Sequence, residues 1–170
     1  GSLSAPPTTP HGVYSEVGQL RKVLVCSPGL AHERLTPTNS ASLLFDDVLW
    51  VENAQRDHAA FVTSLRERGV EVLELHEVLA ETMCDPQARA WLLERKIGPN
   101  TVGLGLVEET RAWLEELETT ELVRHLIGGL STHDLPADLG SKSATSALAL
   151  ARSTNGVHEY LMPPLPNTLY

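Results

Sequence analysis

The sequence is short of positive charge, has few cysteines and contains no long hydrophobic run. Its 13 Lys and Arg residues stand against 22 Asp and Glu residues, which gives a net charge of −9. Binding to nucleic acid needs clustered Lys and Arg side chains that displace counterions from phosphates, so this balance disfavours a nucleic-acid partner. No stretch reaches the roughly 18 consecutive apolar residues of a transmembrane helix, so no membrane span is predicted.

The sequence also lacks the pattern of a secretory signal. Its start has neither an initiator Met nor a basic segment followed by an apolar one. Residues 1–11 are predicted to be a tag remnant followed by a mobile Ser/Thr/Pro-rich tail. The two cysteines, Cys26 and Cys84, lie far apart in the sequence. Without a secretory signal, two reduced cysteines in a cytoplasmic protein are favoured over a disulfide.

Motifs for metals and organic cofactors are missing. The seven histidines include no pair with metal-ligand spacing, and the two cysteines are not separated by two residues. The stretch "GLGL", Gly103–Leu106, precedes a predicted helix but follows no predicted strand, which argues against a dinucleotide-binding loop. The sequence therefore gives no sign of a metal or of an organic cofactor.

Residues 21–76 have the pattern of a strand–loop–helix–strand unit. Val23–Cys26 is a short, apolar, β-branched run that is typical of a buried strand. A helix is predicted next, and Gly69 stands where a left-handed residue would end it. The stretch "VEVLEL" at 70–75 then alternates as a strand does. Parallel pairing of the two strands is favoured. The apolar face of the predicted helix consists of Ala54, His58, Phe61, Val62 and Leu65.

From His76 onward the apolar residues recur with a helical period. Asp85 followed by Pro86 predicts an N-cap with proline at the first helical position. Three to five short helices are predicted between residue 77 and about residue 150, followed by a strand at Val157–Met162. Residues 139–156 are rich in small side chains and fit either a loose helix or a mobile linker. This layout indicates an α/β fold with a helical insertion.

Two stretches contain candidate binding residues. In "LLFDDVLW" the adjacent carboxylates Asp46 and Asp47 lie in an apolar segment, and an unpaired buried carboxylate is costly. They therefore either border a site for a cationic ligand or form an N-cap or a salt bridge, for example with Arg56. In "PPLPNTLY" the prolines hold the chain extended before Asn167, whose amide can both donate and accept hydrogen bonds. A turn residue is the structural alternative for Asn167.

His58 and Cys26 are predicted to have structural roles. His58 falls on the apolar face of a predicted helix, where a core or boundary histidine is favoured over a ligand. A reactive cysteine needs a nearby His, Arg or helix N-terminus to lower its pKa. Cys26 ends an apolar strand and has no base near it in the sequence, so packing in the core is favoured.

Five stretches together resemble bacterial arginine deiminases. They are "GVYSEVGQLRKVLVCSPG", "RLTP", "LLFDDVLWVENAQRDHAAFV", "RERGVEVLELHEVLAET" and "MPPLPNTLY". The resemblance covers almost all of residues 12–170, with 139–156 as the weakest part. It implies a five-bladed α/β propeller with an inserted α-helical bundle. Residues 12–76 would be the first blade, 77–156 the helical insertion and 157–170 the start of the next propeller strand.

The resemblance also implies a chemistry and two substrate-binding residues. The family hydrolyses L-arginine to L-citrulline and ammonia without a metal or an organic cofactor. A cysteine thiolate attacks the guanidinium carbon, a histidine handles protons, and carboxylates grip the guanidinium. Asn167 is implied to contact the α-carboxylate end of the substrate, and the backbone of Leu44, on a mobile lid loop, its amino end. Asp46 and Asp47 are assigned to the support of that lid.

The resemblance assigns no catalytic residue to this chain. In the family the segment similar to "PPLPNTLY" runs into Thr-Arg-Asp, whose Asp grips the guanidinium, and the Glu, the His and the nucleophilic Cys follow far downstream. We therefore expect an N-terminal fragment that is inactive alone and is accompanied by a C-terminal fragment or by a second copy of the chain. The alternative is a non-catalytic interaction or assembly module that uses the helical insertion as its surface.

Overall fold

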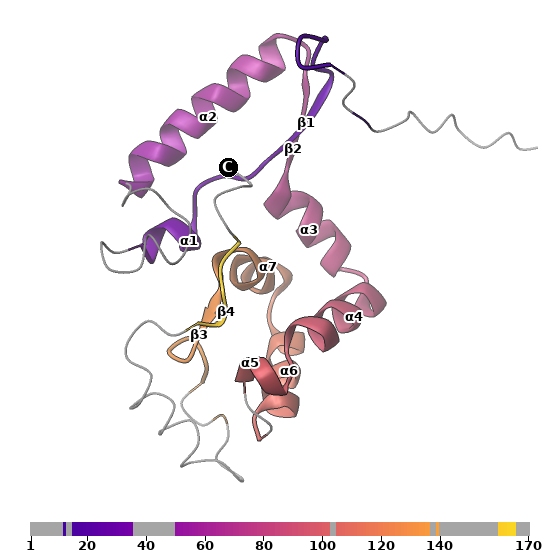
Figure 1. Ribbon diagram of the computed structural model, residues 1–170, viewed down its shortest axis with the longest axis vertical. Helices are drawn as coiled ribbons and strands as arrows, with labels where there is room; N and C mark the ends of the chain where they lie inside the picture. Colours follow the sequence, from indigo (N-terminus) through magenta and orange to yellow (C-terminus); the bar gives the residue numbers. More distant parts are fainter. Residues whose placement is uncertain are drawn as a thin grey trace, which may run out of the picture.

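The computed structural model describes residues 12, 15–35, 50–102, 105–136, 139 and 160–165. Within these ranges the chain forms helices and two small two-stranded sheets (Figure 1). This mixture is compatible with the predicted α/β class. Apart from Leu139, the stretch predicted to be a loose helix or a linker lies outside the described residues.

The predicted strand–helix–strand unit is present. It consists of β1 (Lys22–Val25), α2 (Val51–Glu67) and β2 (Glu71–Glu74), which we call the β–α–β unit. The strands pair in parallel, with Val23 opposite Val72, so the predicted parallel pairing is confirmed. A short helix, α1 (Leu30–Glu33), follows β1 in the chain. Figure 1 shows the β–α–β unit at one end of the molecule and most of the later helices toward the other.

Helix α2 ends where the sequence predicts. Gly69 has a φ of 79°, in the left-handed region that favours glycine. Its N–H donates to the Arg66 carbonyl at 2.9 Å, and the Val70 N–H donates to the Leu65 carbonyl at 3.1 Å. These two bonds satisfy carbonyls in the last turn of the helix and direct the chain into β2.

The predicted apolar face of α2 is only partly covered. Val62 is buried, and Ala54, His58 and Leu65 are half-buried, but Phe61 is 54% exposed. Phe61 therefore shares the predicted face of the helix but is not covered by the described residues. Among the described elements, it is β2 that packs against α2. A strand of four residues covers only part of a helix of 17 residues.

Five helices follow, which we call the helical region. They are α3 (Leu75–Met83), α4 (Pro86–Lys96), α5 (Pro99–Val102), α6 (Val107–Glu116) and α7 (Thr119–Gly128). The predicted cap of α4 is confirmed, because the Asp85 carboxylate accepts from the Gln87 N–H at 2.8 Å and Pro86 is the first helical residue. One boundary differs from the prediction, since Leu75 begins α3 instead of ending the strand.

The main hydrophobic core lies in the helical region. Burying one leucine-sized side chain contributes about 1.5–3 kcal/mol, so this core dominates the stability of the described residues. Cys26 enters the same core from the end of β1 and joins the sheet to the helices. The largest fully buried apolar side chains are Leu93, Ile97, Leu114, Leu122 and Leu130.

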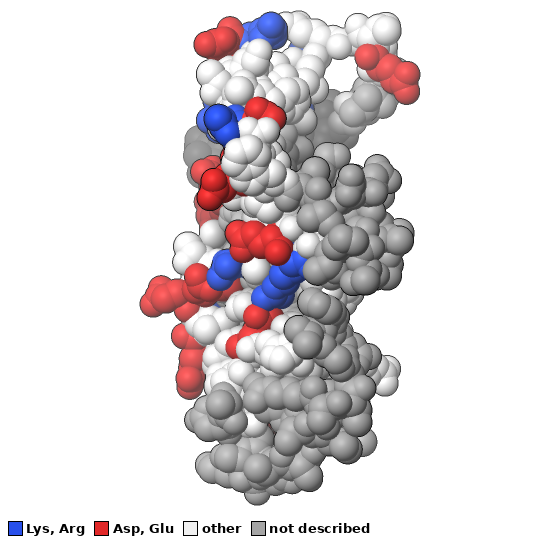
Figure 2. Space-filling view, turned by 90° about the vertical axis from the view of Figure 1, so that its left-hand side faces the viewer, with Lys and Arg blue, Asp and Glu red and all other residues white. Residues whose placement is uncertain are grey.

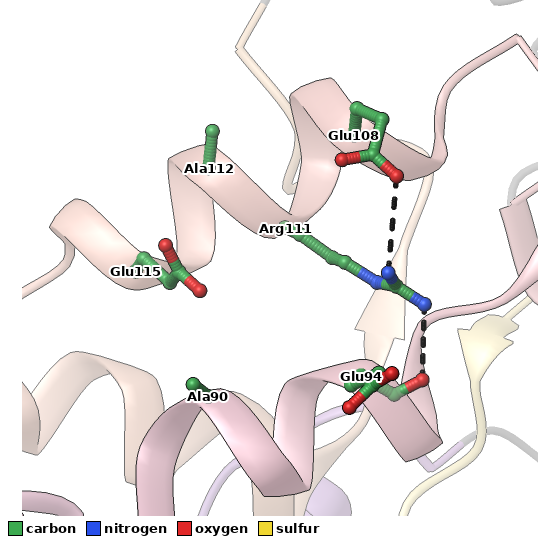
Figure 3. Close-up of a pocket in the computed structure, with 6 residues that line it drawn as sticks. All are labelled: Ala90, Glu94, Glu108, Arg111, Ala112 and Glu115. Carbon is green, nitrogen blue, oxygen red and sulfur yellow. Dashed lines mark hydrogen bonds and ion pairs between the residues drawn. The ribbon is translucent and has the colours of Figure 1, made fainter. Parts of the chain in front are cut away.

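Two arginines join α4 and α6 by capping each other's helix. Arg111 on α6 donates to the carbonyls of Ile97, at 2.8 Å, and Glu94, at 3.0 Å, at the end of α4. In return, Arg89 on α4 donates to the Leu114 carbonyl of α6 at 2.9 Å. The last carbonyls of a helix lack partners within it, so each arginine satisfies groups that the other helix leaves open. Figure 3 shows Arg111 reaching across the groove between the helices. The groove is lined by Ala90, Glu94, Glu108, Arg111, Ala112 and Glu115.

A second, antiparallel sheet follows the helices. It pairs β3 (Leu130–Ser131) with β4 (Tyr160–Met162). The strand predicted at 157–162 is confirmed for its last three residues, while 157–159 lie outside the described residues. The sequence did not predict β3, because a strand of two residues has no periodicity of its own.

Charges of both signs are interspersed on the face shown in Figure 2. Lys and Arg side chains there stand beside Asp and Glu side chains and do not gather into a positive patch. Arg124, for example, lies 3.5 Å from Glu33 and 3.7 Å from Glu121. Among the helices of the described residues, none combines the length and the apolar character needed to cross a bilayer.

Candidate functional site

A cluster of polar side chains lies at the carboxyl edge of the β1–β2 sheet. Because the strands are parallel, their carboxyl ends meet at one edge, which is where ligands bind in open α/β sheets. Ser27 lies two residues after β1, Glu74 is the last residue of β2, and His76 lies in the first turn of α3. We call Cys26, Ser27, Glu74 and His76 the strand-end cluster.

Glu74 is the centre of the strand-end cluster. Its Oε1 accepts hydrogen bonds from the Ser27 N–H at 2.8 Å and the Ser27 hydroxyl at 3.1 Å, and lies 3.0 Å from His76 Nδ1. Its Oε2 lies 3.5 Å from Nε2 of His58 on α2. One carboxylate thus connects the segment after β1 with β2, α2 and α3.

The surroundings of Glu74 favour its charged form. Burial, which leaves its side chain 16% exposed, would by itself raise the pKa of the carboxyl group. Hydrogen bonds from the Ser27 N–H, His76 and the Ser27 hydroxyl, together with the charge of His76, outweigh burial and hold the pKa of Glu74 below its usual 4.5. The carboxylate is therefore ionised at neutral pH and attracts cations.

Cys26 is both a core residue and a member of the strand-end cluster. Its side chain is 4% exposed and belongs to the main hydrophobic core, so the predicted packing role is confirmed. Its Sγ also lies within 4.8 Å of one ligand atom each from Glu74 and His76. The sequence showed no base near Cys26, but the fold brings His76 to it. Burial of the thiol closes it to attack on an outside substrate.

His58 occupies the boundary position that the sequence predicts. Its side chain is half-buried on α2 and faces Glu74. The Nε2 atom is buried, and no hydrogen-bond partner for it occurs within the described part of the chain. The carboxylate 3.5 Å away compensates this nitrogen electrostatically when the ring is protonated.

The segment after β1 is held from two helices. The side-chain amide of Gln55, on α2, donates to the Pro28 carbonyl at 2.9 Å. The Gly29 N–H donates to Nδ1 of His32, on α1, at 3.3 Å. His32 is itself buried, and burial lowers the pKa of its imidazole. These contacts fix the backbone that presents Ser27 to Glu74.

The end of α7 orients the proline segment at 163–165. The Leu165 N–H donates to the Ile127 carbonyl at 2.9 Å. Gly129 has a φ of 86°, and a Cβ there would lie 2.8 Å from the backbone nitrogen of Pro164. The close approach requires glycine, so the sequence "GGL" after α7 positions the segment that leads toward Asn167.

Arg34 ties α1 to the turn after β3. Its guanidinium donates to the Gly129 carbonyl at 3.0 Å and to Oδ1 of Asp134 at 2.5 Å. The other oxygen of Asp134 accepts from the Ser131 N–H at 2.7 Å. The pair is mostly buried, so it joins α1 to the turn after β3 through a charge-assisted contact.

The two residues predicted to contact the substrate, Leu44 and Asn167, fall outside the described residues, as do Asp46 and Asp47, which were predicted to support the lid. The roles of all four stay predictions. The sequence also missed the strand-end cluster. A signal was present, namely a Glu-x-His stretch closing one strand and a Cys-Ser pair closing the strand predicted to lie parallel to it.

The strand-end cluster brings together a thiol, an imidazole and an ionised carboxylate. These are the donor types that bind zinc-like divalent ions. The same groups also make a hydrogen-bonded brace, since Glu74 already accepts from Ser27 and lies beside His76. Cys26, Glu74 and His76 are therefore the described residues best placed to hold a metal ion.

One comparison with known protein families found a match to most of the chain. A family model described as arginine deiminase matches residues 41–170, which is 130 of the 170 residues. The match spans α2, β2, the helical region and β4. It also includes the positions of Leu44 and Asn167.

Proposed function

The chain belongs to the arginine deiminase family, and on this premise we propose that it serves the hydrolysis of L-arginine to L-citrulline and ammonia. The family match over three quarters of the chain carries this proposal. In the mechanism that the resemblance implies, a cysteine thiolate attacks the guanidinium carbon and ammonia leaves. Water then releases citrulline, with a histidine acting as acid and base.

In this proposal the β–α–β unit is the core of a first propeller blade at 12–76. Residues 77–156 are a helical insertion, and 157–170 begin the next propeller strand. Two observations support the division: the parallel pair β1–β2 with its helical crossover, and the change from strand to helix between Glu74 and Leu75.

Two residues are proposed to contact the substrate. The Asn167 amide would bind the α-carboxylate of arginine, and the Leu44 backbone would bind the α-amino group on a lid that Asp46 and Asp47 support. The proline segment that precedes Asn167 in the sequence supports the first of these roles, because the Leu165 hydrogen bond to α7 fixes its backbone and a pre-ordered segment loses less conformational freedom on binding.

These 170 residues are proposed to have no hydrolytic activity by themselves. The resemblance assigns the nucleophilic Cys, the catalytic His and the gripping carboxylates to none of them. Cys26 is buried in the core, and Cys84 lies at the end of α3, outside the strand-end cluster. Neither forms a disulfide, which fits the predicted cytoplasmic location.

A partner is proposed to cover the β–α–β unit. Leu24 of β1 and Phe61 of α2 are more than half exposed, and open sheet edges invite pairing with further strands. The partner would be the C-terminal part of the same enzyme or a second copy of the chain. Sedimentation of the chain alone, and after mixing with the C-terminal portion of an arginine deiminase, tests this. A chain that remains monomeric both alone and after mixing with that portion contradicts the proposed partner.

Citrulline formation tests the catalytic proposal. We expect none from the chain alone and measurable turnover when the catalytic C-terminal portion is supplied. In the assembled enzyme, Asn167→Ala should raise KM for arginine at least tenfold, because a charge-assisted contact to the carboxylate is lost. Asn100→Ala, in α5, is the matched control and should leave KM unchanged. Turnover by the chain alone would overturn its assigned inactivity.

A non-catalytic interaction module is the second candidate. The closely packed core centred on the helical region favours it, since a stable group of helices can present an interaction surface. Arginine titration separates the two candidates. Arginine binding by the assembled protein that Asn167→Ala weakens supports the enzyme, and assembly without any arginine binding supports the module.

A further inference from the structure

We propose that Cys26, Glu74 and His76 bind one Zn²⁺ ion at the carboxyl edge of the β1–β2 sheet. One ligand atom from each residue lies within 4.8 Å of the other two. Zinc binds sulfur at about 2.3 Å and nitrogen or oxygen at about 2.0–2.2 Å. Tetrahedral geometry then separates the ligand atoms by roughly 3.3–3.6 Å. Ligand atoms at the 4.8 Å limit would have to close by about 1–1.5 Å to take up the ion.

The donor set selects the class of ion. A thiolate and an imidazole favour borderline-soft ions such as Zn²⁺, whereas Mg²⁺ and Ca²⁺ prefer oxygen ligands alone. Three protein ligands leave a fourth position, which water fills in zinc sites of this kind. The site is therefore a mixed sulfur, nitrogen and oxygen site for one zinc-like ion.

The surrounding residues hold the ligands in place. Ser27 donates two hydrogen bonds to Glu74 Oε1, and such outer contacts orient ligating carboxylates in metal sites. His58 lies outside the group of atoms within 4.8 Å, so we assign it to Glu74 and not to the ion. Its buried Nε2 faces Glu74 Oε2 at 3.5 Å. The ligands come from two segments, the end of β1 and the junction of β2 with α3, which the ion would join.

Binding releases a proton. The Cys26 sulfhydryl gives up its hydrogen and forms the sulfur–zinc bond, so each ion bound sends at least one H⁺ to the solvent. Glu74 ligates as a carboxylate and His76 through a nitrogen that carries no proton, so any proton held at these two ligating atoms also passes to the solvent. No oxidant or reductant is involved, and the binding is independent of arginine hydrolysis.

Cobalt and zinc titrations of the reduced chain test the site. Co²⁺ serves as a visible probe, because a cobalt–thiolate bond gives a near-ultraviolet charge-transfer band. We expect one Co²⁺ per chain with that band, displacement by one equivalent of Zn²⁺, and no displacement by Mg²⁺. A chain that binds neither ion at micromolar concentration would refute the proposal.

Matched variants assign the ligands. Cys26→Ser should remove the charge-transfer band, and His76→Gln should weaken Zn²⁺ binding at least tenfold. Cys84→Ser and His133→Gln change exposed residues of the same types and should alter the dissociation constant less than twofold. A band that survives in Cys26→Ser, or is lost in Cys84→Ser, overturns the assignment.

The unmodified chain provides a test that does not depend on folding of a variant. In weakly buffered solution, at least one proton should appear per Zn²⁺ added, because the Cys26 sulfhydryl gives up its hydrogen. Zinc that binds without releasing a proton would contradict a site that contains the Cys26 thiol.

Discussion

The β–α–β unit and the helical region differ in how completely they bury their own apolar side chains. Leu114 and Leu122 of the helical region are 0% exposed. In the β–α–β unit, Leu24 is 53% and Phe61 is 54% exposed, and its most buried side chains are Val25 and Val62, each 9% exposed. The apolar side chains of the helical region are therefore largely enclosed in the main core. In the described β–α–β unit, part of the apolar surface faces solvent.

The cause lies in how each kind of element covers its neighbours. Short amphipathic helices that follow one another fold back and cover each other's apolar stripes, as α3 does with α7 and α4 with α6. A two-stranded sheet has two faces to cover, and such a sheet is marginally stable by itself. We infer that local stability is unequal, with the β–α–β unit opening more readily than the helical region.

The largest expected effect comes from removing one leucine from each region. Leu114→Ala should lower the free energy of unfolding by about 3–4 kcal/mol, because it leaves a cavity in a closed core. Leu24→Ala should cost less than about 0.5 kcal/mol, because the side chain is already half in water. Urea unfolding followed by circular dichroism measures both. Similar losses at the two positions would contradict the unequal burial.

Two glycines give the next largest contrast. Gly129→Ala should lower the free energy of unfolding by about 3 kcal/mol. Its φ of 86° and ψ of 164° lie in a region used almost only by glycine, and the new Cβ would lie too close to Pro164. Gly69→Ala should cost about 1 kcal/mol, since it has a left-handed φ but nothing within 4 Å of a Cβ. Thermal unfolding ranks them. A larger loss of stability at Gly69 would show that the left-handed turn after α2 matters more than the close packing of Gly129 against the chain at β4.

The elements that the sequence predicted are those with local signals. Asp85 with Pro86, and Gly69, mark helix ends through contacts with residues a few positions away, so their geometry follows from the sequence. The strand β3 depends on Met162, which lies 32 positions after Leu130. No local pattern contains that partner.

The strand-end cluster was not predictable for the same reason. Ser27 and Glu74 are 47 positions apart and meet only because β1 and β2 pair in a particular register. An apolar run predicted the first strand, alternation predicted the second, and the strand–helix–strand order favoured their parallel direction. Four residues do not fix which residue lies opposite which, and a shift by one position would turn Glu74 to the other face.

The contact between α1 and the turn after β3 predicts a smaller effect. Arg34→Leu should cost about 2 kcal/mol, because it leaves the mostly buried carboxylate of Asp134 without its charged partner. Arg124→Leu removes an exposed pair with Glu33 and should cost less than about 0.5 kcal/mol. Hydrogen exchange should then show faster opening around α1 in Arg34→Leu alone. Equal exchange in both variants would show that Arg34 does not couple α1 to that turn.

The smallest expected effect is a dependence on pH in the helical region. Burial lowers the pKa of His125 below its usual 6.5, with Asp134 and Glu121 opposing the change and Arg34 adding to it. Below pH 6.5 the unfolded chain therefore binds more protons than the folded one. Stability from this group is complete above pH 6.5 and falls as the pH drops toward the folded-state pKa.

His125→Gln isolates that contribution, because glutamine keeps hydrogen-bonding groups but does not titrate. The variant should lose less stability than the unmodified chain between pH 7.5 and 5.5, as measured by urea unfolding at each pH. His133→Gln, at an exposed position, should leave the slope unchanged. Because the ring of His125 packs 5.9 Å from Trp113 inside the helical region, exchange protection should fall there first. A slope that His125→Gln leaves intact would assign the pH dependence to another group, of which buried His32 on α1 is the next to test.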